Sequence, residues 1–185
     1  MQARDGWGLA ESAAILQYLA DQYQAVGKVS ERWYPKDLRT RSRINALMAW
    51  HGSTLRTGSM LVGWHLVVAP NLGRQSNIKL VQDYGIPTLN EALRTINDVW
   101  LSEGGAFLVG QCITIADLLL ACEVEQLKLL EGNLQGVDIS YEKLIAPYPK
   151  VTVWMDNVRQ ACGCETWDDV HRTLYKMMAR MKSKL

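Results

Sequence analysis

The feature that most limits the fold is the helical spacing of apolar residues along nearly all of the chain after Pro35. A first long helix is predicted after Asp37, which can serve as its N-cap, and is expected to end at Pro70, Asn71 and Gly73. Its apolar stripe consists of Ile44, Leu47, Met48, His51, Leu55 and Val62. Further helices are predicted over residues 88–103, 114–131, 149–161 and 166–181. This pattern predicts a mainly α protein whose main domain is a helix bundle.

Only the first residues have strand character. Asp5-Gly6 is a strong signal for a two-residue hairpin turn. Residues 1–4 are too few for a good partner strand, and an isolated hairpin is marginal in water, so we expect the chain to begin inside a sheet. A helix that starts with Ser12 as its N-cap and is closed by Gly27 follows this strand segment.

The charge balance gives no reason to expect a nucleic acid or an anionic membrane as a partner. The chain has 20 Lys and Arg residues against 19 Asp and Glu residues, a formal net charge of +1. Its longest apolar stretch, residues 61–72, is interrupted by Gly63, His65 and Pro70 and is much shorter than a bilayer span. We therefore expect no nucleic-acid partner and no membrane span.

The cysteines have neither metal-ligand spacing nor a CxxC redox pair, and no secretory signal precedes them. We expect Cys112, Cys122, Cys162 and Cys164 to be reduced thiols in an intracellular compartment. Cys162-Gly163-Cys164 follows a predicted helix end and is interpreted as two free thiols in a turn; a redox role is the alternative.

The histidines and tryptophans suggest structural roles. No HxxxH or HExxH arrangement occurs, so no metal site is predicted. The histidines interpreted as structural are His51, His65 and His171. The tryptophans interpreted as packing in the core or at a domain interface are Trp50, Trp64 and Trp154.

The segment around Thr114 contains a complete device for starting a helix. Thr114 is the predicted N-cap, and Asp117, three residues later, is its reciprocal partner in a capping box. Ile113 and Leu118 supply the accompanying hydrophobic staple. We expect this structural cap to begin a well-defined helix.

Several segments, in the expected order and at roughly the expected distances, resemble the cytosolic glutathione transferases. Residues 107–117 have the form FLxGxxxTIAD and are followed by an apolar helix and by a YPKVxxW segment at residues 148–154. Residues 11–19, ESAAILQYL, resemble the element that closes the glutathione-binding domain of these enzymes. The WYPKDL segment at residues 33–38 and the WHGSTLR segment at residues 50–56 resemble the theta class in particular. Asp168-x-x-His171 resembles its plant members, and the resemblance covers essentially the whole chain.

The resemblance implies a division of the chain into three parts. Residues 1–27 would be a remnant of the thioredoxin-like glutathione-binding domain, consisting of a hairpin turn, a strand and a helix. Residues 28–36, which have mixed charge and no sustained period, would be a linker. Residues 37–185 would form an all-helical bundle of the glutathione-transferase C-terminal type. Family members pair, so a homodimer or a larger assembly is expected.

The chemistry that the resemblance implies is conjugation of glutathione to an electrophile, or reduction of a hydroperoxide. Glutathione would be a co-substrate, with no bound cofactor, and its thiolate would be the nucleophile. Theta-like enzymes activate this thiol with a serine hydroxyl in a segment that this sequence does not contain, so we expect an N-terminally truncated chain that is inactive alone. The alternative is a non-catalytic scaffold or a subunit of a larger assembly.

The resemblance also assigns glutathione-binding residues. Glu11 and Ser12 match the pair that holds the γ-glutamyl end, and the competing interpretation is a simple helix cap with an acid beside it. Ser53 and Arg56 match positions near glutathione in the cleft between the domains, and for Arg56 a solvated arginine on an exposed helix face is the alternative.

The last three residues, Ser183-Lys184-Leu185, form the tripeptide that addresses proteins to peroxisomes when it stands at a free C-terminus. Plant theta-like enzymes include peroxisomal members, which agrees with this interpretation. The alternative is that a helix simply ends there with lysines that favour its dipole, in which case a cytoplasmic protein is expected.

Overall fold

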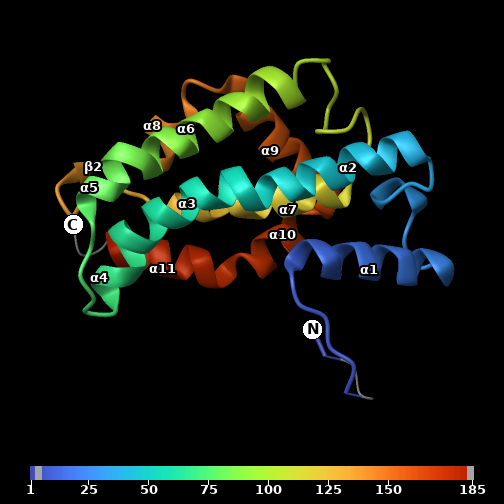
Figure 1. Ribbon diagram of the computed structural model, residues 1–185, viewed down its shortest axis with the longest axis horizontal. Coiled ribbons are helices and arrows are strands. Elements are labelled where there is room, and N and C mark those ends of the chain that lie inside the picture. The colour runs from blue at the N-terminus through green and yellow to red at the C-terminus, as the bar shows by residue number, and fades with distance from the viewer. Residues whose placement is uncertain (3–5, 183–185) are drawn as a thin grey trace.

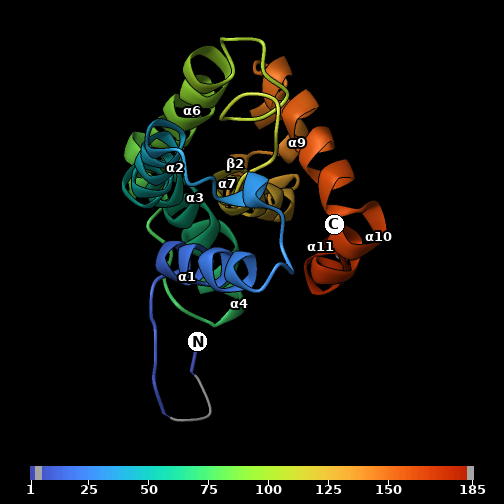
Figure 2. The same ribbon diagram turned by 90° about the vertical axis from the view of Figure 1, so that its right-hand side faces the viewer.

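The computed structural model describes residues 1–2 and 6–182 and is a bundle of helices, as the sequence predicts (Figures 1 and 2). The α-helices are α1 Ser12–Ala25, α2 Leu38–Trp50, α3 Arg56–Gly63, α4 Ala69–Asn71, α5 Ile78–Leu80, α6 Ile86–Thr95, α7 Ile115–Gln126, α8 Tyr141–Ile145, α9 Pro149–Cys162, α10 Cys164–Val170 and α11 Arg172–Lys182. Wider π-helical turns lie at His51–Leu55, Trp64–Val68, Val81–Gly85 and Ile96–Trp100, and short 3-10 helices at Glu31–Trp33 and Leu127–Leu129. The strands are β1 Asn133–Leu134 and β2 Val137–Asp138.

The first long helix is confirmed. Helices α2, α3 and α4 follow one another through two π turns without a break, so residues 38–71 form a single continuous helix. Asp37 caps it as predicted, because its carboxylate accepts the Thr40 N–H at 2.8 Å and the Thr40 hydroxyl at 2.7 Å. Gly73, with φ of 65°, lies two residues beyond its last turn.

The second long helix begins ten residues before the predicted start at Thr88. It runs from Ile78 through α6 to Trp100, and the Asn77 side chain caps it by accepting the Leu80 N–H at 3.0 Å. The predicted start directly follows Pro87, which has no N–H to donate and is disfavoured inside a helix. Pro87 instead lies in the first turn of α6, directly after a π turn in which Ile86 N–H binds the Val81 carbonyl.

The two long helices cross closely at Gly58. A methyl group at this position would come within 2.6 Å of the Leu89 backbone nitrogen. Glycine therefore allows α3 and α6 to approach at this point, and both Gly58 and Leu89 are buried there.

Helix α7 forms the centre of the bundle. It contacts α1, α2, α3 and α9, and nine of its residues are buried: Ile115, Ala116, Asp117, Leu119, Leu120, Ala121, Glu123, Val124 and Glu125. With nine of its twelve residues buried the helix has no polar face, which explains the apolar run over residues 118–122. The predicted capping box at its start is confirmed, with the Thr114 N–H bound to Asp117 at 2.9 Å.

Asp117 also binds segments outside its own helix. One carboxylate oxygen accepts the Leu108 N–H at 2.8 Å and the Trp154 indole N–H at 2.9 Å. The side chain is fully buried, and this burial raises the pKa of Asp117 while the four hydrogen bonds it accepts oppose the rise. The cap thus joins α7 to the preceding loop and to α9.

Helix α1 begins one residue earlier than its predicted cap implies. Ser12 is the first helical residue, whereas Glu11 occupies the N-cap position, so the prediction of Ser12 as N-cap is wrong. The predicted end is confirmed: Gly27 has φ of 68°, and the Lys28 N–H reaches back to the Tyr23 carbonyl at 2.9 Å.

The C-terminal third contains elements that the sequence did not reveal. Strands β1 and β2 form a tight antiparallel hairpin around Gln135 and Gly136, both with positive φ, so strand structure is not confined to the first residues. The short helix α8 follows this hairpin. The single helix predicted over residues 166–181 is divided at His171 into α10 and α11, and α10 starts at Cys164.

The N-terminal segment leads away from the helices (Figures 1 and 2). Gln2 and Gly8 form an antiparallel bridge, and Met1 exchanges two hydrogen bonds of 2.9 Å with Leu9. The predicted Asp5-Gly6 turn lies partly outside the described residues. The Ser183-Lys184-Leu185 tail lies wholly outside them. The division into residues 1–27, 28–36 and 37–185 stays a prediction.

Candidate functional site

Glu11 has a strained backbone at the entrance to α1. Its φ of 65° and ψ of 118° lie in a region that residues with a side chain rarely adopt. Its side chain makes no capping hydrogen bond to the helix and is exposed. A simple cap would use the side-chain oxygen to bind the first turn, so the structure gives that interpretation no support.

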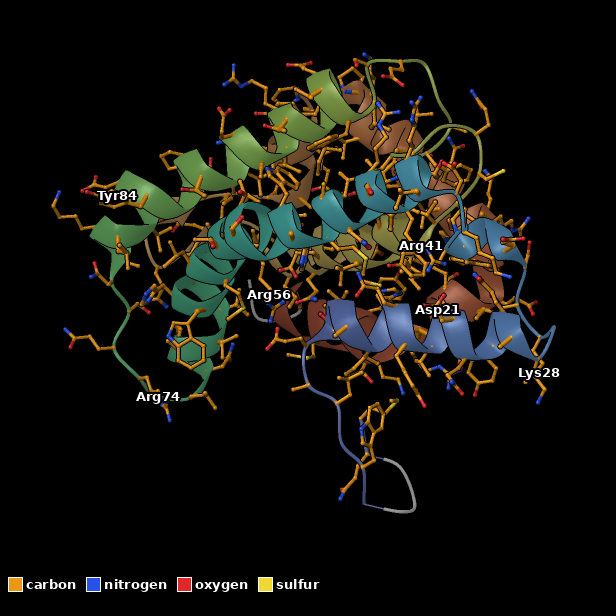
Figure 3. All side chains as sticks on the ribbon, turned by 45° about the vertical axis from the view of Figure 1, so that its right-hand side comes forward. Asp21, Lys28, Arg41, Arg56, Arg74 and Tyr84 are labelled. Carbon is orange, nitrogen blue, oxygen red and sulfur yellow. The ribbon has the colours of Figure 1, made fainter. Side chains whose placement is uncertain are left out.

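The register between α1 and α2 places Ser12 near the predicted cleft residues. The two helices run antiparallel, since Asp21 pairs with Arg41 at 3.1 Å and Gln17 pairs with Asn45 at 2.9 Å (Figure 3). Four residues back along α1 are thus matched by four residues forward along α2. Because both helices rise about 1.5 Å per residue, a further step of similar length along each brings the start of α1 level with about residues 50–53.

Arg56 is held by a buried carboxylate. Its Nη1 donates to Glu123 Oε2 at 2.7 Å, and the Glu123 side chain is only 5% exposed. The Arg56 side chain is 48% exposed, so much of its guanidinium group still faces solvent. In Figure 3 Arg56 projects from the long helix toward the start of α1. One end of the guanidinium group is thus paired with Glu123, and the rest of it faces solvent as the alternative interpretation expects.

Glu123 is fixed by two further partners. His51 Nε2 lies 3.3 Å from Glu123 Oε2, and the Ser59 hydroxyl donates to Glu123 Oε1. Both partners are buried. Burial by itself would raise the pKa of Glu123, but the hydrogen bonds from His51, Ser59 and Arg56 outweigh it and lower the pKa to about 2. Glu123 is consequently ionised at neutral pH.

A small hollow lies beside this cluster. Its volume is about 80 Å³, and its lining includes Glu123, Ser59, Met60, Trp64 and Leu127. The lining is mostly apolar, with the polar cluster at one side. By the register of α1 and α2, Ser12 is level with the segment that contains Ser53, and Arg56 follows about one turn further along the long helix. No hydrogen bond joins any two of the four predicted residues among the described contacts; Ser53 Oγ donates to the Trp50 carbonyl at 3.3 Å.

Comparison with known protein families identifies the helical domain. A family model described as "Glutathione S-transferase, C-terminal domain" matches residues 62–161, which is more than half of the chain. The chain belongs to the glutathione S-transferase family. The predicted fold class, a glutathione-transferase helix bundle with a short N-terminal segment of the other domain, is confirmed.

Theta-class glutathione S-transferases match most of the chain. Glutathione S-transferase T3 of Arabidopsis thaliana is 34% identical over 177 residues, which are 95% of this chain and 28% of that protein. Glutathione S-transferase T1 of the same plant is 33% identical over 91% of this chain and 65% of its own length. The chain thus spans less than two thirds of these relatives.

A solved structure agrees with the fold. Human glutathione transferase theta-2, crystallised in complex with glutathione and an unknown ligand, superimposes with a TM-score of 0.78 and 28% identity. The match covers 95% of this chain and 66% of that chain. The predicted theta-class resemblance is therefore confirmed.

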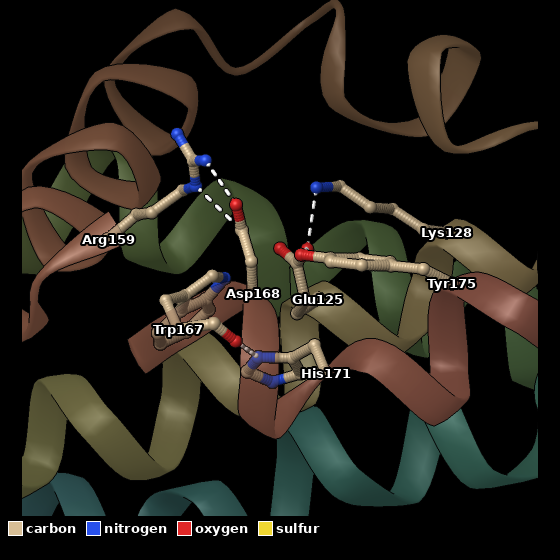
Figure 4. A network of polar contacts seen from close by, with 7 residues as sticks. All are labelled: Glu125, Lys128, Arg159, Trp167, Asp168, His171 and Tyr175. Carbon is tan, nitrogen blue, oxygen red and sulfur yellow. Dashed lines mark hydrogen bonds and ion pairs between the residues drawn. The ribbon is translucent and has the colours of Figure 1, made fainter. Parts of the chain in front are cut away.

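A second polar network in this transferase fold fastens the C-terminal helices (Figure 4). Glu125, which is 2% exposed, accepts the Tyr175 hydroxyl at 2.5 Å and Lys128 Nζ at 2.6 Å. Asp168 binds Arg159 through two hydrogen bonds, of 3.0 and 2.7 Å. Glu125 thereby ties α11 to the central helix, and Asp168 ties α10 to α9.

The three histidines each have a structural partner. His51 contacts Glu123, His65 Nδ1 accepts the Asn77 N–H at 3.2 Å, and His171 Nδ1 lies 2.8 Å from the Trp167 carbonyl. Among the described residues no group of three His, Cys, Asp or Glu side chains could hold a metal ion. No described helix is long and apolar enough to cross a membrane.

The tryptophans occupy packing positions, and of the cysteines Cys122 and Cys162 are partly buried whereas Cys112 and Cys164 are exposed. Trp154 is buried, and Trp50 meets Trp100 edge to face with ring centroids 6.1 Å apart, whereas Trp64 is half-buried beside the hollow. The four cysteines are free. Burial raises the pKa of Cys122 to about 11 and also raises that of Cys162, which disfavours thiolate formation at both.

Sequence analysis missed Glu123 and Glu125. Both lie in the apolar stretch of α7, and a glutamate within a fully buried helix needs a polar partner. That signal was present in the sequence. The partners Arg56 and Tyr175 are far away in the chain, so only the folded structure identifies them.

Proposed function

We propose that this chain binds glutathione as part of a theta-type glutathione transferase. Glu11 would face the ligand's ammonium group, and Ser12 with the first N–H groups of α1 would face its γ-glutamyl carboxylate. Arg56, which lies about one turn of the long helix beyond the residues level with Ser12, would bind a second anionic group of the ligand. The observation that carries the proposal is the strained backbone of Glu11, whose side chain is exposed and makes no capping hydrogen bond at the start of α1.

The proposal extends to the whole transferase in three respects. Conjugation of an electrophile or reduction of a hydroperoxide would need the thioredoxin-like half, including the serine that activates the thiol. The hollow beside Trp64 would contribute an apolar wall for the electrophile. Pairing into a homodimer or a larger assembly would depend on contacts from both halves.

Glutathione titrated into the 185-residue chain is expected to shift the backbone NMR signals of Glu11, Ser12 and Arg56. Glu11→Ala should weaken this binding about tenfold, because a charge-assisted contact to the ammonium is worth roughly 1.5 kcal/mol. Glu142→Ala, at an exposed acid in α8, serves as the control and should leave the affinity unchanged. Equal affinities of the Glu11→Ala and Glu142→Ala variants would refute the assignment.

We also propose that the tripeptide Ser183-Lys184-Leu185 directs the protein to peroxisomes. A fluorescent protein ending in residues 177–185 is expected to collect in peroxisomes, and deletion of Leu185 should release it to the cytosol. The reason is that the receptor reads the terminal carboxylate together with the three side chains. Diffuse fluorescence of the fusion protein with the intact tail would refute the proposal.

A further inference from the structure

We infer that Glu123 is a positioning residue for ligand binding, which holds the Arg56 guanidinium with its free N–H groups toward the start of α1. The inference rests on the proposed function, since the ligand it concerns is glutathione. It adds a residue from the central helix to a site otherwise formed by α1 and the first long helix.

The contact between the two side chains has the geometry that this role needs. Arg56 Nη1 donates to Glu123 Oε2 at 2.7 Å, which fixes one end of the guanidinium group. A guanidinium carries five N–H donors in a fixed plane, so fixing one end also sets the direction of the other donors. With 48% of the side chain exposed, donors remain accessible to a ligand.

Glu123 itself cannot change its orientation easily. Its second oxygen accepts the Ser59 hydroxyl, and His51 Nε2 lies 3.3 Å from the oxygen that binds Arg56. Ser59 and His51 come from the same long helix as Arg56, and both are buried. Two contacts other than that with Arg56 therefore hold the Glu123 carboxylate in place.

Glu123 has two opposite effects on an anionic ligand. It restricts the Arg56 rotamers, which removes an entropic penalty on binding, and its negative charge repels the ligand. The ligand would approach the guanidinium from its exposed side, away from Glu123, where water and salt screen the repulsion. Restriction of the arginine therefore dominates, and loss of Glu123 weakens binding.

A double-mutant cycle on the full 185-residue chain tests this coupling, with glutathione as the probe. Glu123→Gln is expected to raise the Kd about fivefold, and Arg56→Ala by at least as much. Adding Glu123→Gln to Arg56→Ala should change the Kd no further, because Glu123 acts only through the arginine. A purely structural effect would persist in the double variant.

Glu125→Gln is the matched control. Glu125 is as buried as Glu123 and lies two residues along α7, but it binds Lys128 and Tyr175 rather than Arg56. Its replacement should lower thermal stability and leave the Kd unchanged.

Arg56→Lys is a second test that does not disturb the buried carboxylate. Lysine can still pair with Glu123, so the chain should remain folded, but it lacks the rigid second edge and should bind glutathione more weakly. Unchanged binding by Arg56→Lys would overturn the inference. Tighter or unchanged binding of glutathione by the Glu123→Gln variant would also overturn it. The same holds if Glu123→Gln still weakens binding in a chain that already carries Arg56→Ala. No binding by the unsubstituted chain would instead refute the proposed function, and with it the inference.

Discussion

Replacing Asp117 with Ala is expected to destabilise the chain by about 3 kcal/mol, because several buried donors then lose their acceptor at about 1–3 kcal/mol each. These donors are the Leu108 N–H, the Trp154 indole N–H and both donor groups of Thr114. Release from the burial of a charge offsets part of this loss. For a chain of this length the melting temperature should fall by roughly 6–12 °C.

Asp37→Ala is the control for this measurement. Asp37 also caps a long helix and binds Thr40, but it is exposed. Its replacement should therefore cost only about 1 kcal/mol, the usual value for an N-cap. Thermal and urea unfolding of the two variants would compare them directly. A loss from Asp117→Ala no larger than that from Asp37→Ala would show that the contacts to Leu108 and Trp154 contribute little.

Asp117→Asn separates the parts of the network if the alanine variant does not fold. The amide oxygen can still accept from Leu108 and Trp154, whereas the amide NH2 faces the two donor groups of Thr114. An intermediate loss of stability is expected. A loss equal to that of Asp37→Ala would assign most of the energy to the tertiary half of the network.

The helix starts illustrate what the sequence can and cannot predict. The Asp37 cap and the Thr114–Asp117 box were predicted correctly, because each is a local arrangement whose partners lie within three residues. Asn77 was missed, because Pro87 favoured a later start and the π turn that accommodates it has no clear sequence signal. Ser12 was misassigned by one residue, because the strained backbone of Glu11 cannot be predicted from composition.

The candidate site shows the same limit. A resemblance to known motifs could select Glu11, Ser12, Ser53 and Arg56, since each lies within a recognisable segment. Glu123 could not be assigned to Arg56 in this way, because 67 residues separate the two. The register between α1 and α2, which brings Ser12 level with about residues 50–53, likewise arises only from packing.

The 185-residue chain alone is expected to conjugate glutathione to an alkyl or aryl halide at least about a hundredfold more slowly than a fusion to a theta-like thioredoxin-like half. Thiolate stabilisation by a single preorganised donor accounts for a factor of this size. Two hydroxyls near the described cluster are already engaged, since Ser53 donates to the Trp50 carbonyl and Ser59 to Glu123. Initial rates at saturating glutathione would measure the difference. Comparable steady turnover by the chain alone would mean that an unrecognised group activates the thiol.

The same fusion separates binding from activation. Glu11 would contact the γ-glutamyl end of glutathione, far from its sulfur, so Glu11→Ala should raise the KM for glutathione and leave kcat nearly unchanged. Loss of the activating hydroxyl in the fused half should lower kcat instead, because that interaction strengthens as the thiolate forms. A fall in kcat without a change in KM for Glu11→Ala would place this carboxylate near the reacting sulfur. The strained backbone at Glu11 would then position a catalytic group rather than a binding group.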